Sequence, residues 1–148
     1  MNRTIADLIR KRAHYCCAYC KIPQEFDDLP FQFDHIIAQF HDGSDDHPNR
    51  AWVCVPCNLH KGTNLSGVDS RTGKIVRLFD PRRQSWNRPF RWNDAVLVGK
   101  TQCGRATVRT LRINLTSRVA FRQALIDAGE FPRSEPRRSE PPLRDRVE

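Results

Sequence analysis

The chain has 148 residues, a formal net charge of +8 and a mean hydropathy of −0.65. This length suits one domain with a modest core and short tails, and the polar composition indicates a soluble protein. No apolar run approaches the roughly 20 residues that a membrane span needs, so we expect no membrane partner. We see no signal peptide before the first motif, and we therefore expect a cytoplasmic, reducing location in which disulfides are disfavoured.

The charge is divided unevenly along the chain. Residues 1–76 hold nine Lys/Arg and nine Asp/Glu, whereas residues 77–122 hold eleven Lys/Arg and only two acidic residues. A basic segment beside an electrically balanced one suits a phosphate-binding surface next to a cation-binding site. The alternative is a solvated basic face that only keeps the protein soluble.

The first element that the sequence predicts is a helix over residues 4–15. The stretch 4–7, Thr-Ile-Ala-Asp, is typical of a capping box with Asp in the place of Glu. Apolar residues then recur at helical spacing, at Ile5, Leu8 and Ile9. We expect this apolar face to pack on the segment that follows.

Four cysteines form two Cys-x-x-Cys pairs with 33 residues between them: Cys17, Cys20, Cys54 and Cys57. Two residues between paired cysteines let both thiolates point at one ion, and two such pairs are typical of a tetrahedral four-cysteine zinc site. We therefore predict one structural Zn²⁺ site; the alternatives are two disulfides, or iron in place of zinc. Three residues separate Cys16 from Cys20, whereas two separate Cys17 from Cys20, so we choose Cys17 as the ligand. We predict that Cys16 and Cys103 are small buried residues outside the site.

The segment between the two cysteine pairs contains a predicted strand. Residues 31–37 alternate before they become apolar, and Phe31 and Phe33 share the face that we assign to the core. Asp34 and His35 lie at or near the end of this strand. Consecutive strand residues face opposite ways, so both side chains serve one site only if the chain twists or bends there.

The rest of the chain alternates between polar turns and short apolar runs. A polar loop and a short second strand precede a helix that starts at the second cysteine pair and ends by Gly62 or slightly later. Two hairpins and two helices follow, over residues 67–79, 90–98, 101–114 and 116–128. Residues 132–148 are rich in Pro, Arg, Ser and Glu, and we predict a disordered tail there.

Taken together, these motifs resemble those of the HNH nucleases in their four-cysteine form. The matching residues are the four cysteines, Phe33-Asp34-His35-Ile36-Ile37, Asn49 and Asn58-x-x-Lys61-Gly62. The resemblance extends over about residues 5 to 65 and implies an α+β fold, with a treble-clef-like ββα-metal core that the Cys₄ zinc site stabilises. We divide the chain into this core with its N-terminal helix (1–66), a basic hairpin-plus-helices extension packed on it (67–131) and the disordered tail (132–148).

The resemblance implies a metal-dependent endonuclease that hydrolyses phosphodiester bonds in DNA and leaves 5′-phosphate and 3′-hydroxyl ends. His35 corresponds to the general base, since histidine titrates near neutral pH. Asp34 and Asn58 offer oxygen ligands for a catalytic Mg²⁺ or Mn²⁺ ion beside His35. Asn49 corresponds to the middle Asn of the motif, which braces the loop and helps to orient the histidine. The family often has His where Asn58 stands, and Asn keeps the oxygen ligand.

Seven side chains are candidates for contacts with nucleic acid: His60, Lys61, Arg82, Arg83, Arg105, Arg109 and Arg112. Guanidinium groups at helical spacing would follow a phosphate backbone. We expect DNA as the partner, with RNA as the alternative, and little sequence preference. Trp86, Phe90 and Trp92 could stack on unpaired bases, but we assign Phe90 and Trp92 to the core.

Two other readings compete with the enzyme. One is a catalytically inactive, zinc-stabilised module that binds nucleic acid, and the other is a zinc scaffold for protein partners. The intact set of Asp34, His35 and Asn58 favours the enzyme, because an inactive module could lose it without unfolding. The basic segment 77–122 disfavours the scaffold. Cutting both strands would require a homodimer, and the sequence leaves the oligomeric state and the biological role open.

Overall fold

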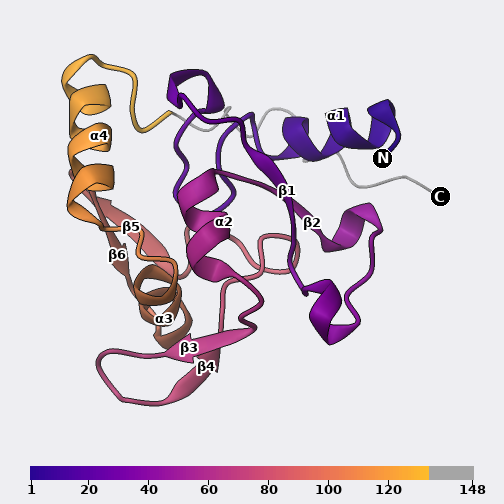
Figure 1. The fold of residues 1–148 in the computed structure, drawn as a ribbon. Coiled ribbons are helices and arrows are strands. Elements are labelled where there is room, and N and C mark those ends of the chain that lie inside the picture. The colour runs from indigo at the N-terminus through magenta and orange to yellow at the C-terminus, as the bar shows by residue number, and fades with distance from the viewer. Residues whose placement is uncertain (134–148) are drawn as a thin grey trace.

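The computed structural model describes residues 1–133, so all but the first two residues of the predicted tail lie outside the described part (Figure 1). The helices are α1 (Arg3–Arg12), α2 (Val55–Lys61), α3 (Gln102–Thr110) and α4 (Thr116–Asp127). The described residues also form three antiparallel pairs of strands: β1 (Gln32–His35) with β2 (Arg50–Val53), β3 (Ser66–Val68) with β4 (Ile75–Arg77), and β5 (Phe90–Asn93) with β6 (Val96–Gly99). The predicted α+β class is confirmed. Among the described residues, no helix has both the length and the apolar character needed to cross a bilayer.

Helix α1 begins earlier than the sequence pattern predicts. The side chain of Asn2 accepts a hydrogen bond from the backbone N–H of Thr4 at 2.7 Å, so Asn2 is the N-cap and the predicted capping box at Thr4 is wrong. The helix ends at Arg12, before the predicted end, because His14 and Tyr15 have left-handed backbone conformations with φ of 52° and 56°. These two residues turn the chain toward the first cysteine pair.

The pair β1–β2 lies between α1 and α2. Phe33 is paired in register with Trp52, and their rings pack at 4.8 Å between centroids. The guanidinium group of Arg10, on α1, lies over both rings at 5.0 and 4.9 Å. Asp34, whose side chain points to the other face, forms an ion pair with Lys61 on α2. One face of the two strands therefore contacts α1 and the opposite face contacts α2.

One core joins the cysteine-rich segment to the basic extension. Tyr19 is fully buried and contacts Phe79 edge-on at 6.2 Å, and Phe79 in turn contacts Phe90 at 5.2 Å. The indole N–H of Trp86 donates to the backbone oxygen of Tyr19 at 2.8 Å. Phe90 is 1% exposed and Trp92 packs against the same cluster, which confirms their assignment to the core.

Arg122 on α4 is a fully buried arginine that ties the last helix to the β5–β6 pair. Its guanidinium group donates to the backbone oxygens of Ala95 and Ile113 at 2.8 and 3.0 Å, and to Oδ1 of Asn114 at 3.0 Å. It also lies over the ring of Trp92 at 5.3 Å. Arg122 lies four residues after Arg118, a helical spacing that would suit a phosphate-binding row, but its burial shows that it is a structural residue.

We expect Arg122→Met to destabilise the protein by about 3 kcal/mol, because three buried or partly buried acceptors lose their donor. Thermal or denaturant unfolding of the zinc-loaded protein measures this change. The matched control is Arg109→Met, an exposed arginine on α3, for which we expect a change below about 0.5 kcal/mol. Equal midpoints for the two variants would contradict this account of Arg122.

Candidate active site and metal centre

Four buried cysteines form one compact cluster. Their Sγ atoms, those of Cys17, Cys20, Cys54 and Cys57, all lie within 4.8 Å of one another. The first pair lies in the turn after α1, and Cys54 is the N-cap of α2. All four are free thiols, and the Sγ atoms of Cys20 and Cys54 are 3.7 Å apart, so the structure does not support the disulfide alternative. A closed, buried, all-sulphur donor set of this kind indicates a structural zinc site.

The remaining cysteines lie outside the cluster. Cys16 is buried, which raises the pKa of its thiol, and Cys103 is only half-buried. Inside the cluster, a hydrogen bond with Cys17 is the main cause of a lowered pKa for Cys20 and of a raised pKa for Cys57. A cation that binds all four sulphurs must displace the remaining thiol protons, so its affinity should fall as the pH falls.

His35, the last residue of β1, lies between a carboxylate and a guanidinium group. Its Nε2 atom is 2.7 Å from Oδ1 of Asp45 and 2.5 Å from a terminal nitrogen of Arg50, which is 3.3 Å from Nδ1. Arg50 is the register partner of His35, and Gln39 donates to the same carboxylate oxygen of Asp45 at 2.8 Å. One ring nitrogen cannot donate to Asp45 and accept from Arg50 at once, so the two side chains compete for Nε2.

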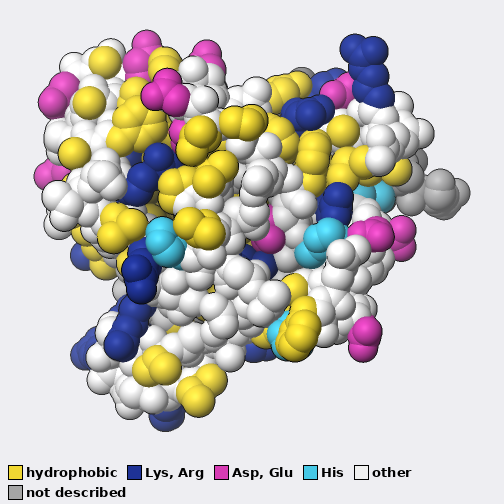
Figure 2. All heavy atoms as spheres, viewed as in Figure 1, with side chains coloured by type: hydrophobic (Ala, Val, Ile, Leu, Met, Phe, Trp, Pro, Cys, Tyr) yellow, Lys and Arg dark blue, Asp and Glu magenta, His cyan; other side chains and the backbone are white. Residues whose placement is uncertain are grey.

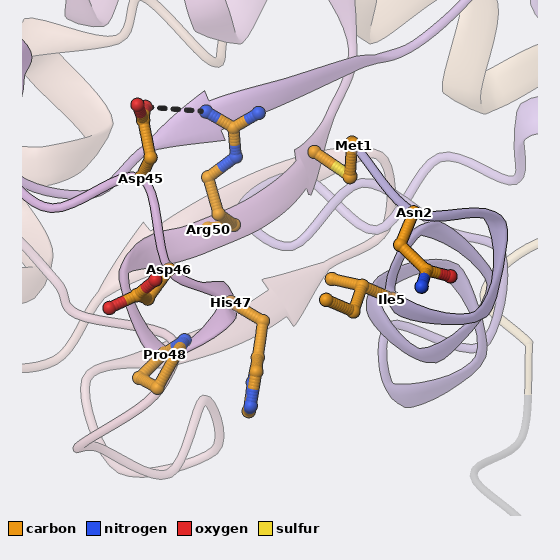
Figure 3. Close-up of a pocket in the computed structure, with 8 residues that line it drawn as sticks. All are labelled: Met1, Asn2, Ile5, Asp45, Asp46, His47, Pro48 and Arg50. Carbon is orange, nitrogen blue, oxygen red and sulfur yellow. Dashed lines mark ion pairs between the residues drawn. The ribbon is translucent and has the colours of Figure 1, made fainter.

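A pocket of about 520 Å³ adjoins this contact (Figure 3). Its lining comes from the start of α1 and the chain leading into β2: Met1, Asn2, Ile5, Asp45, Asp46, His47, Pro48 and Arg50. Asp45 and Arg50 form an ion pair at 3.7 Å across one side of it (Figure 3). The Asp45 side chain is 73% exposed and that of Arg50 only 14%. Solvent therefore reaches the partners of His35 from this side.

Asn49 closes the loop between His35 and β2. Its Oδ1 atom accepts the N–H of Ile37 at 2.8 Å, and its Nδ2 atom donates to the backbone oxygens of Ile37 at 2.9 Å and Ser44 at 2.7 Å. Its own backbone oxygen accepts from Ile36 at 2.9 Å. The loop is closely packed, since a Cβ atom on Gly43 would lie 1.7 Å from the Ile37 oxygen. These are the contacts expected of a residue that braces the loop.

We expect Asn49→Ala to destabilise the protein by about 2 kcal/mol, because three side-chain hydrogen bonds are lost. We also expect slower hydrolysis, since the loop carries Asp45 and so holds His35. Denaturant unfolding and initial rates of DNA cleavage measure the two effects. Asn64→Ala, an exposed position just after α2, is the control and should change neither quantity. An unchanged unfolding free energy for Asn49→Ala would contradict the bracing role.

Asp34 and Asn58 lie on the two elements that contact each other here, β1 and α2. Oδ2 of Asp34, a residue that is 8% exposed, lies 2.9 Å from the ammonium group of Lys61. Lys61 also donates to the backbone oxygen of His35 at 2.9 Å. One helical turn earlier, the side-chain nitrogen of Asn58 donates to Oε1 of Gln32, which lies on the same strand face as Asp34. The structure thus brings two of the three predicted catalytic side chains to one interface.

The imidazole of His35 lies on the other face of the strand. Strand β1 stays paired with β2 through His35, so the alternation of side chains holds to its last residue. The bend that would bring Asp34 and His35 to one face does not occur in the strand. The end of β1 therefore has a carboxylate on the α2 side and an imidazole on the opposite side.

Residues 17–64 match the family described as HNH endonuclease. The chain contains an HNH endonuclease domain. The matched segment begins at Cys17, contains both cysteine pairs, His35 and its loop, and ends three residues after α2. A domain of this family implies nuclease activity on a nucleic-acid substrate. No curated protein and no solved structure matches the chain.

Two predicted phosphate contacts have other partners in the structure. Lys61, inside the HNH domain, is 2% exposed and pairs with Asp34. Arg105 binds Asp69 with two hydrogen bonds, at 2.7 and 3.1 Å, and lowers the pKa of that buried carboxyl group. This pair joins the β3–β4 turn to α3, and we therefore do not carry Lys61 or Arg105 forward as phosphate contacts.

The other predicted contacts differ in their exposure. The Arg83 side chain is 78% exposed, and Arg109 and Arg112 are exposed at the end of α3. His60 and Arg82 are half-buried. Arg83 lines a pocket of about 370 Å³ together with Asn49 and other residues of the HNH loop, so it lies beside the predicted active site.

Asp45 and Arg50 are contacts of His35 that sequence reasoning missed. Both lie in a polar stretch rich in turn residues, where no spacing distinguishes them from their neighbours. The register of β1 with β2 is the only feature that places Arg50 opposite His35. A predicted pairing of the two short strands would have found Arg50, but the position of Asp45 depends on how the HNH loop closes.

Proposed function

We propose that this protein is a metal-dependent endonuclease that hydrolyses phosphodiester bonds in DNA. His35 is the general base, Asp34 and Asn58 hold one ion of the Mg²⁺ or Mn²⁺ class, and the products carry 5′-phosphate and 3′-hydroxyl ends. The observation that carries the proposal is the placement of the His35 imidazole and the Asp34 carboxylate on opposite faces of one strand end, inside the segment that matches the HNH family.

Hydrolysis requires a water molecule to lose a proton to a nearby base. In the tautomer in which Nε2 of His35 donates to Asp45 at 2.7 Å, Nδ1 keeps the lone pair that accepts this proton. Arg50 competes for the same ring in the protein alone. A substrate phosphate offers the Arg50 guanidinium group a charged partner. When the guanidinium group moves from His35 to this phosphate, Asp45 remains as the partner of Nε2.

The donors at Asp34 and Asn58 fit a hard divalent cation. Oδ2 of Asp34 is buried, and its contact with the Lys61 ammonium group is an ion pair without hydrogen-bond geometry. Carboxylate and amide oxygens suit Mg²⁺, which takes its other ligands from water and from substrate phosphate. When bound, such an ion stabilises the charge that develops on the leaving oxygen. The zinc site has no open position for this task, because its four sulphur ligands close it.

The two faces of the strand end suit the geometry of phosphoryl transfer. The attacking and leaving oxygens lie roughly in line, on opposite sides of the phosphorus atom. A phosphodiester across the end of β1 would meet the base on one side and the oxygen ligands on the other. From the sequence, strand alternation was expected to keep Asp34 and His35 out of one site unless the chain bends. In this arrangement the same alternation would place the general base and the metal ligands on opposite sides of the phosphorus atom.

The basic extension supplies the surface for the rest of the substrate. Lys and Arg side chains gather over α3 and the β3–β4 pair, whereas acidic side chains lie mainly over α4 and the loop between β1 and β2 (Figure 2). Of the exposed arginines, Arg83 lies beside the HNH loop. The match to the HNH endonuclease family supports a nucleic-acid substrate, and we favour DNA, with RNA as the alternative that the cleavage assay below tests.

We expect Arg83→Gln to weaken DNA binding and to reduce the slope of log K against log salt by about 1, the value for one lost phosphate contact. Fluorescence anisotropy over a salt series measures both quantities. Arg3→Gln, an exposed arginine at the start of α1, is the control and should leave the slope unchanged. Equal slopes for the wild-type protein and Arg83→Gln would remove Arg83 from the interface.

End-group analysis tests the proposed reaction. Labelled DNA and RNA duplexes and single strands are incubated with zinc-loaded protein and Mg²⁺ or Mn²⁺, and the new ends are analysed. We expect cleavage of DNA with 5′-phosphate and 3′-hydroxyl ends. A monomer has one site and would nick, so cleavage of both strands requires a homodimer. DNA binding without cleavage by either metal would favour the inactive nucleic-acid-binding module.

A further inference from the structure

Lys61 is a buried cation that the proposed reaction does not use. It is the last residue of α2 and is 2% exposed, although a lysine at a helix end is usually solvated. Its ammonium group is 2.9 Å from Oδ2 of Asp34 and 2.9 Å from the backbone oxygen of His35. Lys61 therefore contacts both residues at the catalytic end of β1.

The ion pair is held in place by its burial. Asp34 is 8% exposed, and burial raises the pKa of its carboxyl group while the nearby Lys61 lowers it. Removal of one partner from such a pair would leave an uncompensated buried charge, which proteins rarely tolerate. The ammonium group is thus expected to stay beside Asp34 rather than to swing into solvent.

The pair cancels the charge on which a divalent cation depends. Asp34 contributes one negative charge, Lys61 one positive charge, and Asn58 none. A Mg²⁺-class ion is usually bound by one or two carboxylates together with substrate phosphates. With the one carboxylate of the proposed site neutralised by Lys61, the phosphate of the substrate becomes the main anionic ligand.

We propose that Lys61 makes divalent-cation binding at Asp34 conditional on substrate phosphate. The inference rests on the proposed function, in that Asp34 is taken as a ligand of the catalytic ion. The protein alone binds Mg²⁺ or Mn²⁺ weakly, and DNA and the cation each raise the affinity of the protein for the other. By linkage, the factor by which DNA strengthens cation binding equals the factor by which the cation strengthens DNA binding.

Mn²⁺ binding, followed by electron paramagnetic resonance of the free ion, tests the proposal without measuring activity. The zinc-loaded protein is titrated with Mn²⁺ with and without a short DNA duplex, in a His35→Ala background that prevents cleavage. We expect DNA to tighten Mn²⁺ binding by on the order of tenfold or more. The variant Lys61→Met, with a neutral side chain of similar length, should bind Mn²⁺ about tenfold more tightly without DNA.

Two controls separate the possible outcomes. Lys11→Met removes an exposed lysine from α1 and should leave Mn²⁺ binding unchanged, which accounts for the change in net charge. Asp34→Asn should abolish the DNA-dependent Mn²⁺ binding. If Asp34→Asn has no effect, Asp34 does not hold the ion, and the metal site of the proposed function fails together with this inference.

If Asp34→Asn weakens binding but Lys61→Met binds Mn²⁺ no more tightly than the wild-type protein, the inference is overturned and the proposed metal site stands. Thermal unfolding first establishes that Lys61→Met is folded. If Lys61→Met is not folded, the titration of the protein with Lys61 intact, with and without DNA, decides the question. The inference is overturned if DNA does not change the Mn²⁺ dissociation constant.

Discussion

Cys54→Ala is expected to unfold the HNH domain and to release its zinc. Cys54 is fully buried, caps α2 and provides one of the four clustered sulphur atoms. Structural zinc contributes about 10–16 kcal/mol to small metal-binding domains, whereas whole domains are stable by only about 5–15 kcal/mol. If the loss of this ligand releases the zinc, the free energy lost is therefore comparable to the whole stability of the domain.

Zinc content by mass spectrometry and thermal unfolding by circular dichroism measure this effect. The matched control is Cys16→Ala, because Cys16 is also buried and adjoins the cluster without belonging to it. We expect this variant to keep its zinc and to lose no more than about 1 kcal/mol of stability, as for a small buried side chain. Cooperative unfolding of Cys54→Ala with full zinc content would contradict the assignment of a Cys₄ zinc site.

His35→Ala is expected to keep zinc, fold and DNA binding while cleavage falls by about 10²- to 10⁴-fold, the usual contribution of a general base. The His35 ring contacts the side chains of Asp45 and Arg50, and no residue of the core depends on it. Removal of the ring should therefore spare the fold and affect the reaction selectively.

Initial rates on saturating DNA, together with binding by anisotropy, separate the loss of chemistry from a loss of affinity. His41→Ala is the control. His41 lies on the same loop, but its ring contacts the backbone oxygen of Thr63 at 3.1 Å and lies outside the proposed machinery. Turnover in His35→Ala equal to that of the wild-type protein would remove His35 as the base.

The zinc cluster could be predicted from the sequence because its signal is local. Two residues between cysteines specify a turn whose sulphurs point at one ion, and two such turns need only meet. The choice of Cys17 over Cys16 followed from the same spacing, and the structure confirms it. The hairpins and helices of the extension could also be predicted, since turn residues and helical periodicity mark them.

The contacts of individual charged residues could not be predicted in the same way. Arg105 and Arg109 are four residues apart on α3, and Arg122 is four residues after Arg118 on α4, yet Arg105 pairs with a buried carboxylate, Arg109 is exposed and Arg122 is fully buried. Periodicity specifies which residues share a helix face, but only the packing of that helix decides whether the face meets solvent or core. Lys61 shows the same limit, because a lysine at the end of a short helix gives no sign of burial.

The start of α1 was missed for a different reason. Asn2 and Thr4 are both good N-cap residues, and the capping-box pattern over residues 4–7 favoured the wrong one. The structure selects Asn2, whose side chain accepts the Thr4 N–H. Helix boundaries that depend on one hydrogen bond are harder to predict than the helix itself.

Metal-dependent endonuclease activity can be measured by incubating the zinc-loaded protein with supercoiled plasmid and Mg²⁺ or Mn²⁺, with EDTA and with His35→Ala in parallel. We expect metal-dependent conversion of the supercoiled form, which is lost both with EDTA and in the variant. Absence of cleavage with either metal, despite salt-sensitive DNA binding, would contradict the proposed activity and favour a module that binds nucleic acid without cutting it.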